Sequence, residues 1–79
     1  MASITELEQE LALANRRLTE IHAEIGRQRR LVHRLEKAGD DATEAESLLQ
    51  VVQWILEAMH SHRELILREL AKAPGEEVG

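Results

Sequence analysis

A heptad repeat in the first half of this 79-residue chain constrains its fold more than any other feature. The repeat advances in alternating steps of three and four residues through Ile4, Leu7, Leu11, Ala14, Leu18, Ile21, Ile25, Gln28, Val32 and Leu35. A strict 3.5-residue period keeps one stripe of a helix against a neighbouring helix and winds the pair into a left-handed supercoil. The sequence therefore predicts a long helix over about 4–38 that packs on at least one other helix.

Local signals mark both ends of this helix. Ser3 followed by Glu6 has the spacing of a capping box, in which each side chain accepts a hydrogen bond from the other residue's backbone N–H. Gly39 follows the last periodic residue and can adopt the left-handed conformation that closes a helix. A turn over 39–41 is therefore expected to follow the helix.

A second helix is predicted over about 42–73. Asp41 with Glu44 repeats the capping-box spacing, with Asp in place of Ser or Thr. Pro74 and Gly75 end the periodic pattern, and we expect the small, acidic tail over 74–79 to be disordered. The whole chain, residues 1–79, is then one helical-hairpin domain.

The second helix has a wider apolar face than the first. Two long helices joined by a short turn are antiparallel neighbours, and this turn sets Ile25 against the Leu56 region and Ile21 against Met59. One seam cannot cover the whole face, so we expect an all-α, two-helix antiparallel hairpin that dimerises into a four-helix bundle. The expected oligomer interface comprises Leu11, Leu18, Ile21, Ile25, Gln28, Val52, Ile55, Leu56, Met59 and Ile66.

The composition excludes several classes of protein. The chain has no Cys, Phe or Tyr and a single Trp, which excludes a disulfide scaffold, a Cys-based zinc site and a thiol enzyme. A charged content of 32% with abundant Ala, Leu and Glu is typical of long helices rather than of an all-β domain. No apolar run is long enough to span a membrane and the start does not resemble a secretory signal, so a cytoplasmic protein is expected.

No set of residues suggests catalysis or a cofactor. The Ser and Thr residues have capping or ordinary helical explanations, and a rod offers no deep pocket, so we expect a protein that is not an enzyme. Four histidines are the only candidates for metal ligands. His60 and His62 are two apart and diverge on a helix, although His22 could approach either across the hairpin. A small metal-binding protein is the third, least favoured reading, and we expect no metal site.

The charge distribution leaves two readings open. The net charge is −5, yet five basic residues cluster near the end of the first helix, at Arg27, Arg29, Arg30, Arg34 and Lys37. This cluster could bind nucleic acid, or it could complement the helix dipole and the acidic start of the second helix. The absence of aromatic residues among these bases favours the structural reading.

Two further features also have alternative readings. Gln28 and Arg63 are polar residues at seam positions, where a single polar residue often fixes register and oligomeric state. Trp54 could cover the edge of the bundle core or, with Val51, Ala58 and Leu65, form a strip for another protein.

The segment Arg27-Gln28-Arg29-Arg30-Leu31-Val32 opens a pattern that continues with Leu35, Gly39, Asp41, Leu48-Leu49 and His62-Arg63. The pattern, RQxxLVxxL, then GxD, LL and HR, resembles small uncharacterised proteobacterial helical-hairpin proteins and covers about half of the chain. Ala42 departs from it, since that group tends to have Thr there. The resemblance implies a bacterial cytosolic hairpin and does not imply any particular activity.

The sequence thus favours a self-associating helical scaffold or adaptor that binds another protein, through Trp54, Val51 and Leu65 or through Arg27, Arg30 and Arg34 near the turn. The alternative is a small regulatory or nucleic-acid-associated protein that uses the basic cluster. We expect a homodimer without cofactor, and neither nucleic acid nor membrane as the main partner.

Overall fold

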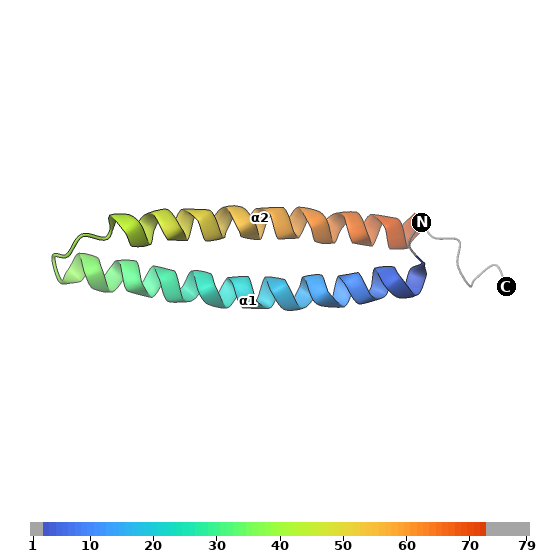
Figure 1. Cartoon of the computed structure of the whole chain (residues 1–79), viewed down its shortest axis with the longest axis horizontal. Helices are drawn as coiled ribbons and strands as arrows, with labels where there is room; N and C mark the ends of the chain where they lie inside the picture. Colours follow the sequence, from blue (N-terminus) through green and yellow to red (C-terminus); the bar gives the residue numbers. More distant parts are fainter. Residues whose placement is uncertain (1–2, 73–79) are drawn as a thin grey trace.

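The computed structural model describes residues 3–72 as two long antiparallel helices, α1 (Ile4–Lys37) and α2 (Thr43–Lys72). They lie side by side along their full length, with the turn at one end of the rod (Figure 1). The all-α hairpin predicted from the sequence is confirmed, and each helix begins and ends within one residue of its expected bounds where those bounds are described. The predicted tail over 74–79 lies outside the described residues.

The start of α1 is capped as the sequence predicts. The hydroxyl of Ser3 accepts a hydrogen bond from the Glu6 N–H at 3.1 Å, and the Glu6 carboxylate accepts one from the Ser3 N–H at 2.9 Å. Hydrogen bonding of the Glu6 carboxylate by the Ser3 backbone N–H first, and by the Ser3 side chain second, holds the pKa of Glu6 below its ordinary value. Both donors would otherwise be unsatisfied in the first turn of the helix.

The end of α1 is a Schellman turn built on Gly39. Its φ of 76° lies in the left-handed region, where a residue with a Cβ is strained. The Gly39 N–H donates to the Glu36 carbonyl at 3.1 Å, and the Asp40 N–H donates to the Leu35 carbonyl at 2.9 Å. This pair of bonds satisfies carbonyls that the ending helix leaves open and reverses the chain toward α2.

The start of α2 differs from the predicted Asp41–Glu44 capping box. The Asp41 carboxylate instead accepts two hydrogen bonds from Thr43, from its N–H at 2.9 Å and from its hydroxyl at 2.6 Å. The Thr43 hydroxyl and then its backbone N–H lower the pKa of Asp41. The Asp41 carboxylate is therefore bonded to Thr43 and not to the backbone N–H of Glu44, as a capping box would require, and α2 begins at Thr43.

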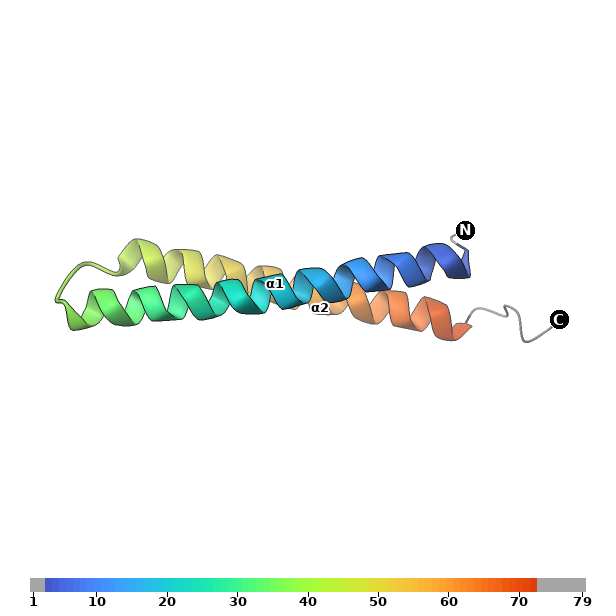
Figure 2. The ribbon, with the colours of Figure 1, turned by 90° about the horizontal axis from the view of Figure 1, so that it is seen from below.

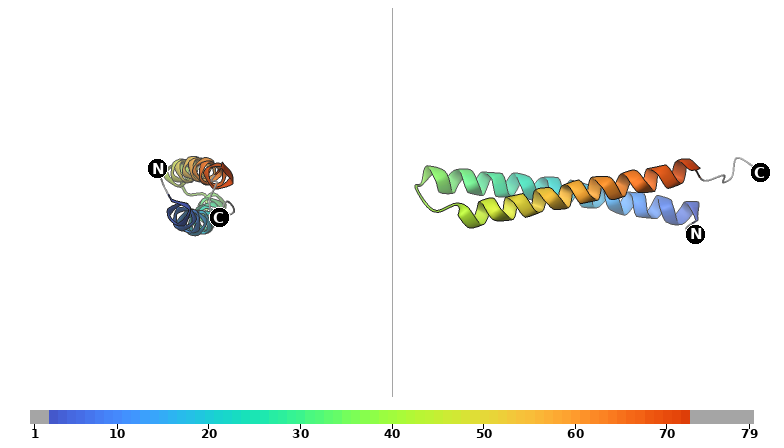
Figure 3. Two further views of the ribbon diagram at one scale, coloured as in Figure 1. Left: turned by 90° about the vertical axis from the view of Figure 1, so that its right-hand side faces the viewer. Right: turned by 90° about the horizontal axis from the view of Figure 1, so that it is seen from above.

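The core of the hairpin is one narrow seam. Every heptad position of α1 from Ile4 to Leu35 is buried or half-buried, and α2 meets it with its own heptad series of Ala45, Leu49, Val52, Leu56, Met59, Arg63, Ile66 and Leu70. The two ribbons cross near their midpoints, as a supercoiled pair does (Figure 2, Figure 3). Ile66, at 4% exposure, is the most buried residue of this core, and no large side chain within residues 3–72 falls below 2%.

Two contacts across the seam fix its register. The Arg63 Nε atom donates a hydrogen bond to Asn15 Oδ1 at 2.6 Å, and the rings of His22 and His60 meet edge to face with their centroids 6.0 Å apart. Both agree with the register expected from a short turn. His22 therefore does approach His60 across the hairpin.

Candidate self-association surface

A second apolar stripe runs along α2 beside the seam. The large hydrophobic residues left exposed within residues 3–72 are Leu13 on α1 and five on α2, namely Leu48, Val51, Trp54, Ile55 and Leu65. Four of the five continue a heptad spacing of their own. We call the α2 stripe the six residues in that spacing: Leu48, Val51, Ile55, Ala58, His62 and Leu65.

Helix geometry explains why this stripe cannot join the core. The seam of α2 occupies heptad positions a and d, and the α2 stripe occupies positions g and c, which lie to one side of that seam. Leu49 and Leu48 are neighbours in sequence, yet Leu49 is half-buried in the seam whereas Leu48 is 47% exposed. One neighbouring helix covers only about one such stripe, so α1 leaves the other open.

The corresponding positions of α1 lie on the same side of the hairpin. In an antiparallel pair the g positions of both helices flank the seam together, and Leu31 and Leu48 accordingly line one shallow hollow of about 510 Å³. We call the α1 stripe the residues at these positions in the middle of the helix: Leu13, Arg17, Glu20, Glu24, Arg27 and Leu31. The two stripes together make one face, charged at its centre over α1 and mainly apolar over α2.

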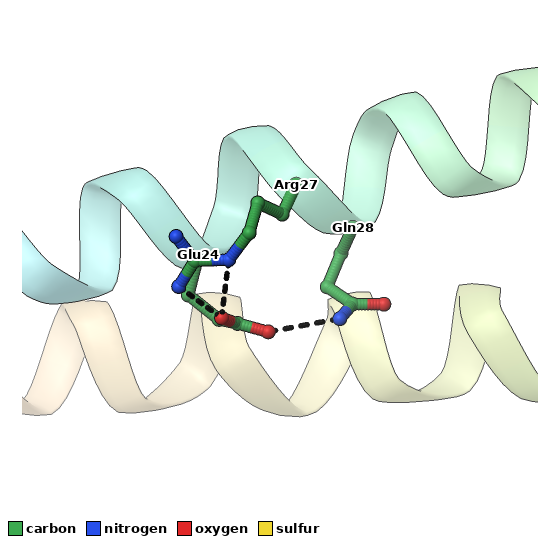
Figure 4. A network of polar contacts seen from close by, with 3 residues as sticks. All are labelled: Glu24, Arg27 and Gln28. Atoms are coloured by element: carbon green, nitrogen blue, oxygen red, sulfur yellow. Dashed lines mark hydrogen bonds and ion pairs between the residues drawn. The ribbon is translucent and has the colours of Figure 1, made fainter.

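A polar network anchors the middle of the α1 stripe. The Glu24 carboxylate accepts hydrogen bonds from Gln28 Nε2 at 2.8 Å and from Arg27 Nε at 3.0 Å, and it forms an ion pair with the Arg27 guanidinium (Figure 4). The Gln28 bond first and the Arg27 bond second lower the pKa of Glu24. Glu24 is therefore ionised at neutral pH and fixed in one orientation.

Gln28 is only partly satisfied by this network. Its Oε1 atom is buried and accepts no hydrogen bond from any residue in 3–72, and it points away from Glu24 and Arg27 (Figure 4). A buried acceptor without a donor costs about 1–3 kcal/mol. The interpretation of Gln28 as a polar seam residue that lowers stability is consistent with this geometry.

Trp54 borders the α2 stripe. Its side chain is 60% exposed, and Val51 and Ala58 lie one helical turn to either side of it. The hairpin itself leaves the ring largely in solvent beside other exposed apolar residues, and contiguous exposed apolar surface is typical of interaction sites. Trp54 thus extends the apolar face outward from the stripe.

The predicted basic cluster forms a concave surface near the turn. Arg27, Arg29, Arg30, His33 and Arg34 line a volume of about 590 Å³ that is open to solvent. Arg27 pairs with Glu24, whereas Arg29, Arg30 and Arg34 form no ion pair with any residue in 3–72. Their charge is therefore available to an anionic partner.

The structure separates the residues expected at an oligomer interface into two groups. All except Ile55 lie along the seam within one chain: Leu18, Ile25, Val52 and Ile66 are buried there, and Leu11, Ile21, Gln28, Leu56 and Met59 are half-buried. Ile55 lies on the α2 stripe and is 42% exposed. Of the expected partner surface, Trp54, Val51 and Leu65 are exposed on or beside that stripe, and Arg27, Arg30 and Arg34 are exposed near the turn.

Sequence reasoning missed the contribution of α1 to this face. Leu13 and Leu31 were not singled out, although the heptad of α1 places both on the side where its g and c positions lie. Their place on this face could have been predicted from the antiparallel pairing, because that pairing sets the g positions of the two helices side by side. No group of three or more potential metal ligands occurs in residues 3–72.

Comparison with known proteins identifies no relative. No protein-family model, no curated protein and no solved structure matches the chain. Within the described part of the chain, neither helix has an apolar stretch long enough to cross a membrane.

Proposed function

We propose that this protein is a non-enzymatic, self-associating helical scaffold whose hairpins pair into a homodimeric four-helix bundle. The observation that carries the proposal is the exposed α2 stripe, which runs beside the seam in the same heptad spacing. Each helix of a four-helix bundle buries more than the single stripe that a two-helix seam covers. The thin core of the hairpin supports the same proposal, because one seam buries little apolar surface for a chain of 79 residues.

Light scattering after size exclusion tests this proposal. The expected mass is twice the 9.0 kDa of one chain. Val51→Glu places a charge in the α2 stripe and should give monomers, whereas Gln50→Glu adds the same charge one residue away on an exposed position outside the stripe and should leave the dimer intact. A wild-type mass of one chain at micromolar concentration would disprove self-association.

As a scaffold or adaptor, the dimer would also hold another protein. Self-association would leave two surfaces partly accessible to such a partner. One is the basic cluster near the turn, and the other is the exposed ring of Trp54 beside the α2 stripe. Affinity capture with wild-type protein, compared with Arg30→Gln/Arg34→Gln and with Trp54→Ala, distinguishes the two surfaces. A partner lost with only one of these variants assigns its surface.

A nucleic-acid-associated regulatory protein is the second candidate. It is favoured by the open surface that Arg29, Arg30, His33 and Arg34 line without intrachain ion pairs. Binding of labelled duplex DNA that falls steeply with salt, and that Arg30→Gln/Arg34→Gln abolishes while Arg68→Gln does not, would support it. Binding insensitive to those arginines would exclude this surface.

A further inference from the structure

We infer that the second copy packs face to face and antiparallel on the two stripes, about a two-fold axis that passes α1 at His22 and α2 between Leu56 and Glu57. This inference rests on the proposed self-association and specifies its geometry. A two-fold interface is isologous, so the same patch must complement itself after rotation. The stripes of this hairpin meet that condition on both helices.

The α2 stripe has the same spacing in both directions. Its six residues follow one another in steps of three, four, three, four and three. When a second α2 lies antiparallel on it, Leu48 meets Leu65 of the partner subunit and Ile55 meets Ala58 of the partner subunit. A large side chain opposite a small one packs closely at the centre, and the two leucine pairs close the stripe at both ends.

The α1 stripe is also symmetric, in residue type as well as in spacing. Read from either end it is Leu, Arg, Glu, Glu, Arg, Leu, in steps of four, three, four, three and four. In the antiparallel arrangement Leu13 meets Leu31 of the partner subunit. The two ends of this stripe are then apolar contacts that continue those of α2.

The charges between these leucines interleave across the axis. Arg17 lies level with Arg27 of the partner subunit and one turn from Glu24 of the partner subunit. Glu20 lies level with Glu24 of the partner subunit and one turn from Arg27 of the partner subunit. Long side chains reach neighbours one turn away, so each central charge has an opposite charge of the other chain within reach. Toward the rod ends, Glu10 comes opposite Arg34 of the partner subunit.

The hairpin register places the two symmetric stripes on one axis. At the turn end, Leu31 and Leu48 line the same hollow. At the other end, Leu13 and Leu65 each lie two residues from the hydrogen-bonded pair Asn15 and Arg63. Because both stripes start and end at the same levels of the rod, their midpoints coincide. One two-fold rotation therefore packs each stripe on its own copy in the partner subunit.

The other two-fold packing of the same faces is less favourable. An axis along the rod would set the α1 stripe of one chain on the α2 stripe of the other. Arg17, Glu20 and Arg27 would then lie on the mainly apolar α2 stripe without an opposite charge from the other chain, at the cost of partly desolvating them. In the antiparallel packing three pairs of like charges lie level: Arg17 with Arg27 of the partner subunit, Glu20 with Glu24 of the partner subunit, and Glu44 with Glu69 of the partner subunit. Each charge of the first two pairs has an opposite charge one turn away, and the exposed Glu69 already lies 3.7 Å from the Lys72 ammonium of its own chain.

Disulfide trapping tests this geometry, because the chain has no cysteine of its own. Leu48→Cys and mass-tagged Leu65→Cys are prepared separately, mixed under reducing conditions and then oxidised. The mixed disulfide should dominate over the two self-disulfides, because the two copies of position 48 lie about 25 Å apart along the rod at 1.5 Å per residue. Gln50→Cys with tagged Glu64→Cys is the matched control, since both are exposed at the same levels of the rod but off the stripe, and should give only background.

The outcomes separate the geometry from the association itself. Self-disulfides at Leu48→Cys that exceed the mixed product, or a mixed product of Leu48→Cys with Leu31→Cys between chains, would overturn the antiparallel packing while leaving dimerisation in place. A wild-type mass of one chain by light scattering would overturn both. A dimer whose Leu48→Cys and Leu65→Cys chains pair well above the Gln50→Cys and Glu64→Cys background establishes the axis.

Discussion

Arg63 and Asn15 form the one side-chain hydrogen bond that joins α1 to α2 within residues 3–72, from Nε to Oδ1 at 2.6 Å. Arg63 occupies a seam position of α2 and is half-buried, whereas Asn15 flanks the seam of α1. If α1 slipped by one heptad along α2, the apolar contacts of the seam would be similar to those of the observed register. Asn15 would, however, move away from Arg63. The pair therefore selects one register among several that the heptads alone allow.

Asn15→Ala should lower the free energy of unfolding by about 1 kcal/mol, since it removes the acceptor of a half-buried charged donor. Urea denaturation monitored by circular dichroism measures the change. Gln9→Ala, an exposed position on the same helix, serves as the control. An unchanged midpoint in Asn15→Ala would show that water replaces the amide without loss and that the bond does not stabilise the register.

Gln28→Leu should raise the melting temperature. The substitution removes a buried acceptor without a donor and adds an apolar side chain to the seam, and together these gains should exceed the loss of the part-buried hydrogen bond to Glu24. Thermal unfolding by circular dichroism tests it, with size exclusion to detect mixed assembly states. A lower melting temperature would show that the Glu24 network stabilises the seam more than an apolar residue does.

Much of this architecture is readable from the sequence because it depends on local and periodic signals. The seam from Ile4 to Leu35, the Ser3–Glu6 capping box and the closing glycine at Gly39 each require knowledge of only one helix. The composite face does not, because Leu31 joins Leu48 only after the two helices are placed antiparallel in a definite register. The partner of Arg63 is hidden for the same reason, since Asn15 lies 48 residues away in the chain.

Gly26→Ala should raise the melting temperature by a few degrees. A Cβ at Gly26 would meet its nearest neighbour, Nη1 of Arg30, at 3.5 Å, which is an ordinary contact with the end of a flexible side chain. The helix would gain about 1 kcal/mol from the higher helix propensity of alanine. Differential scanning calorimetry measures the shift. A loss of stability would indicate that another chain approaches the backbone closely at Gly26.

Acid should destabilise the hairpin through its helix ends. The folded chain holds the pKa of Glu6 and of Asp41 below their ordinary values of 4.5 and 3.8, and Glu24 in the middle of α1 adds a third lowered pKa. A depressed folded pKa contributes stability that is complete above the ordinary value and is lost as the pH falls through the folded one. The melting temperature should therefore drop below about pH 4.5.

Two variants isolate the capping contribution to this acid response. Glu6→Gln and Asp41→Asn each remove one carboxyl with a lowered pKa, so each should flatten the drop, whereas Glu8→Gln alters an exposed carboxylate that makes no hydrogen bond within residues 3–72. The melting temperature is followed from about pH 7 to pH 3 for all four proteins. Parallel curves for wild type and both capping variants would contradict the assignment.

Trp54→Ala should weaken the dimer by about 1–2 kcal/mol, the range for an aromatic residue at the edge of an interface rather than at its centre. In the single hairpin the ring is 60% exposed, so packing of a second chain on the neighbouring α2 stripe should bury part of it. Trp54 is the only tryptophan, and its emission should shift to longer wavelength as the dimer is diluted to monomers. Gln50→Ala, exposed one turn away but off the stripe, should leave the dissociation constant unchanged. If the emission stays constant across the dilution while light scattering records dissociation, Trp54 lies outside the dimer contact and its exposed ring becomes the surface on which a different protein docks.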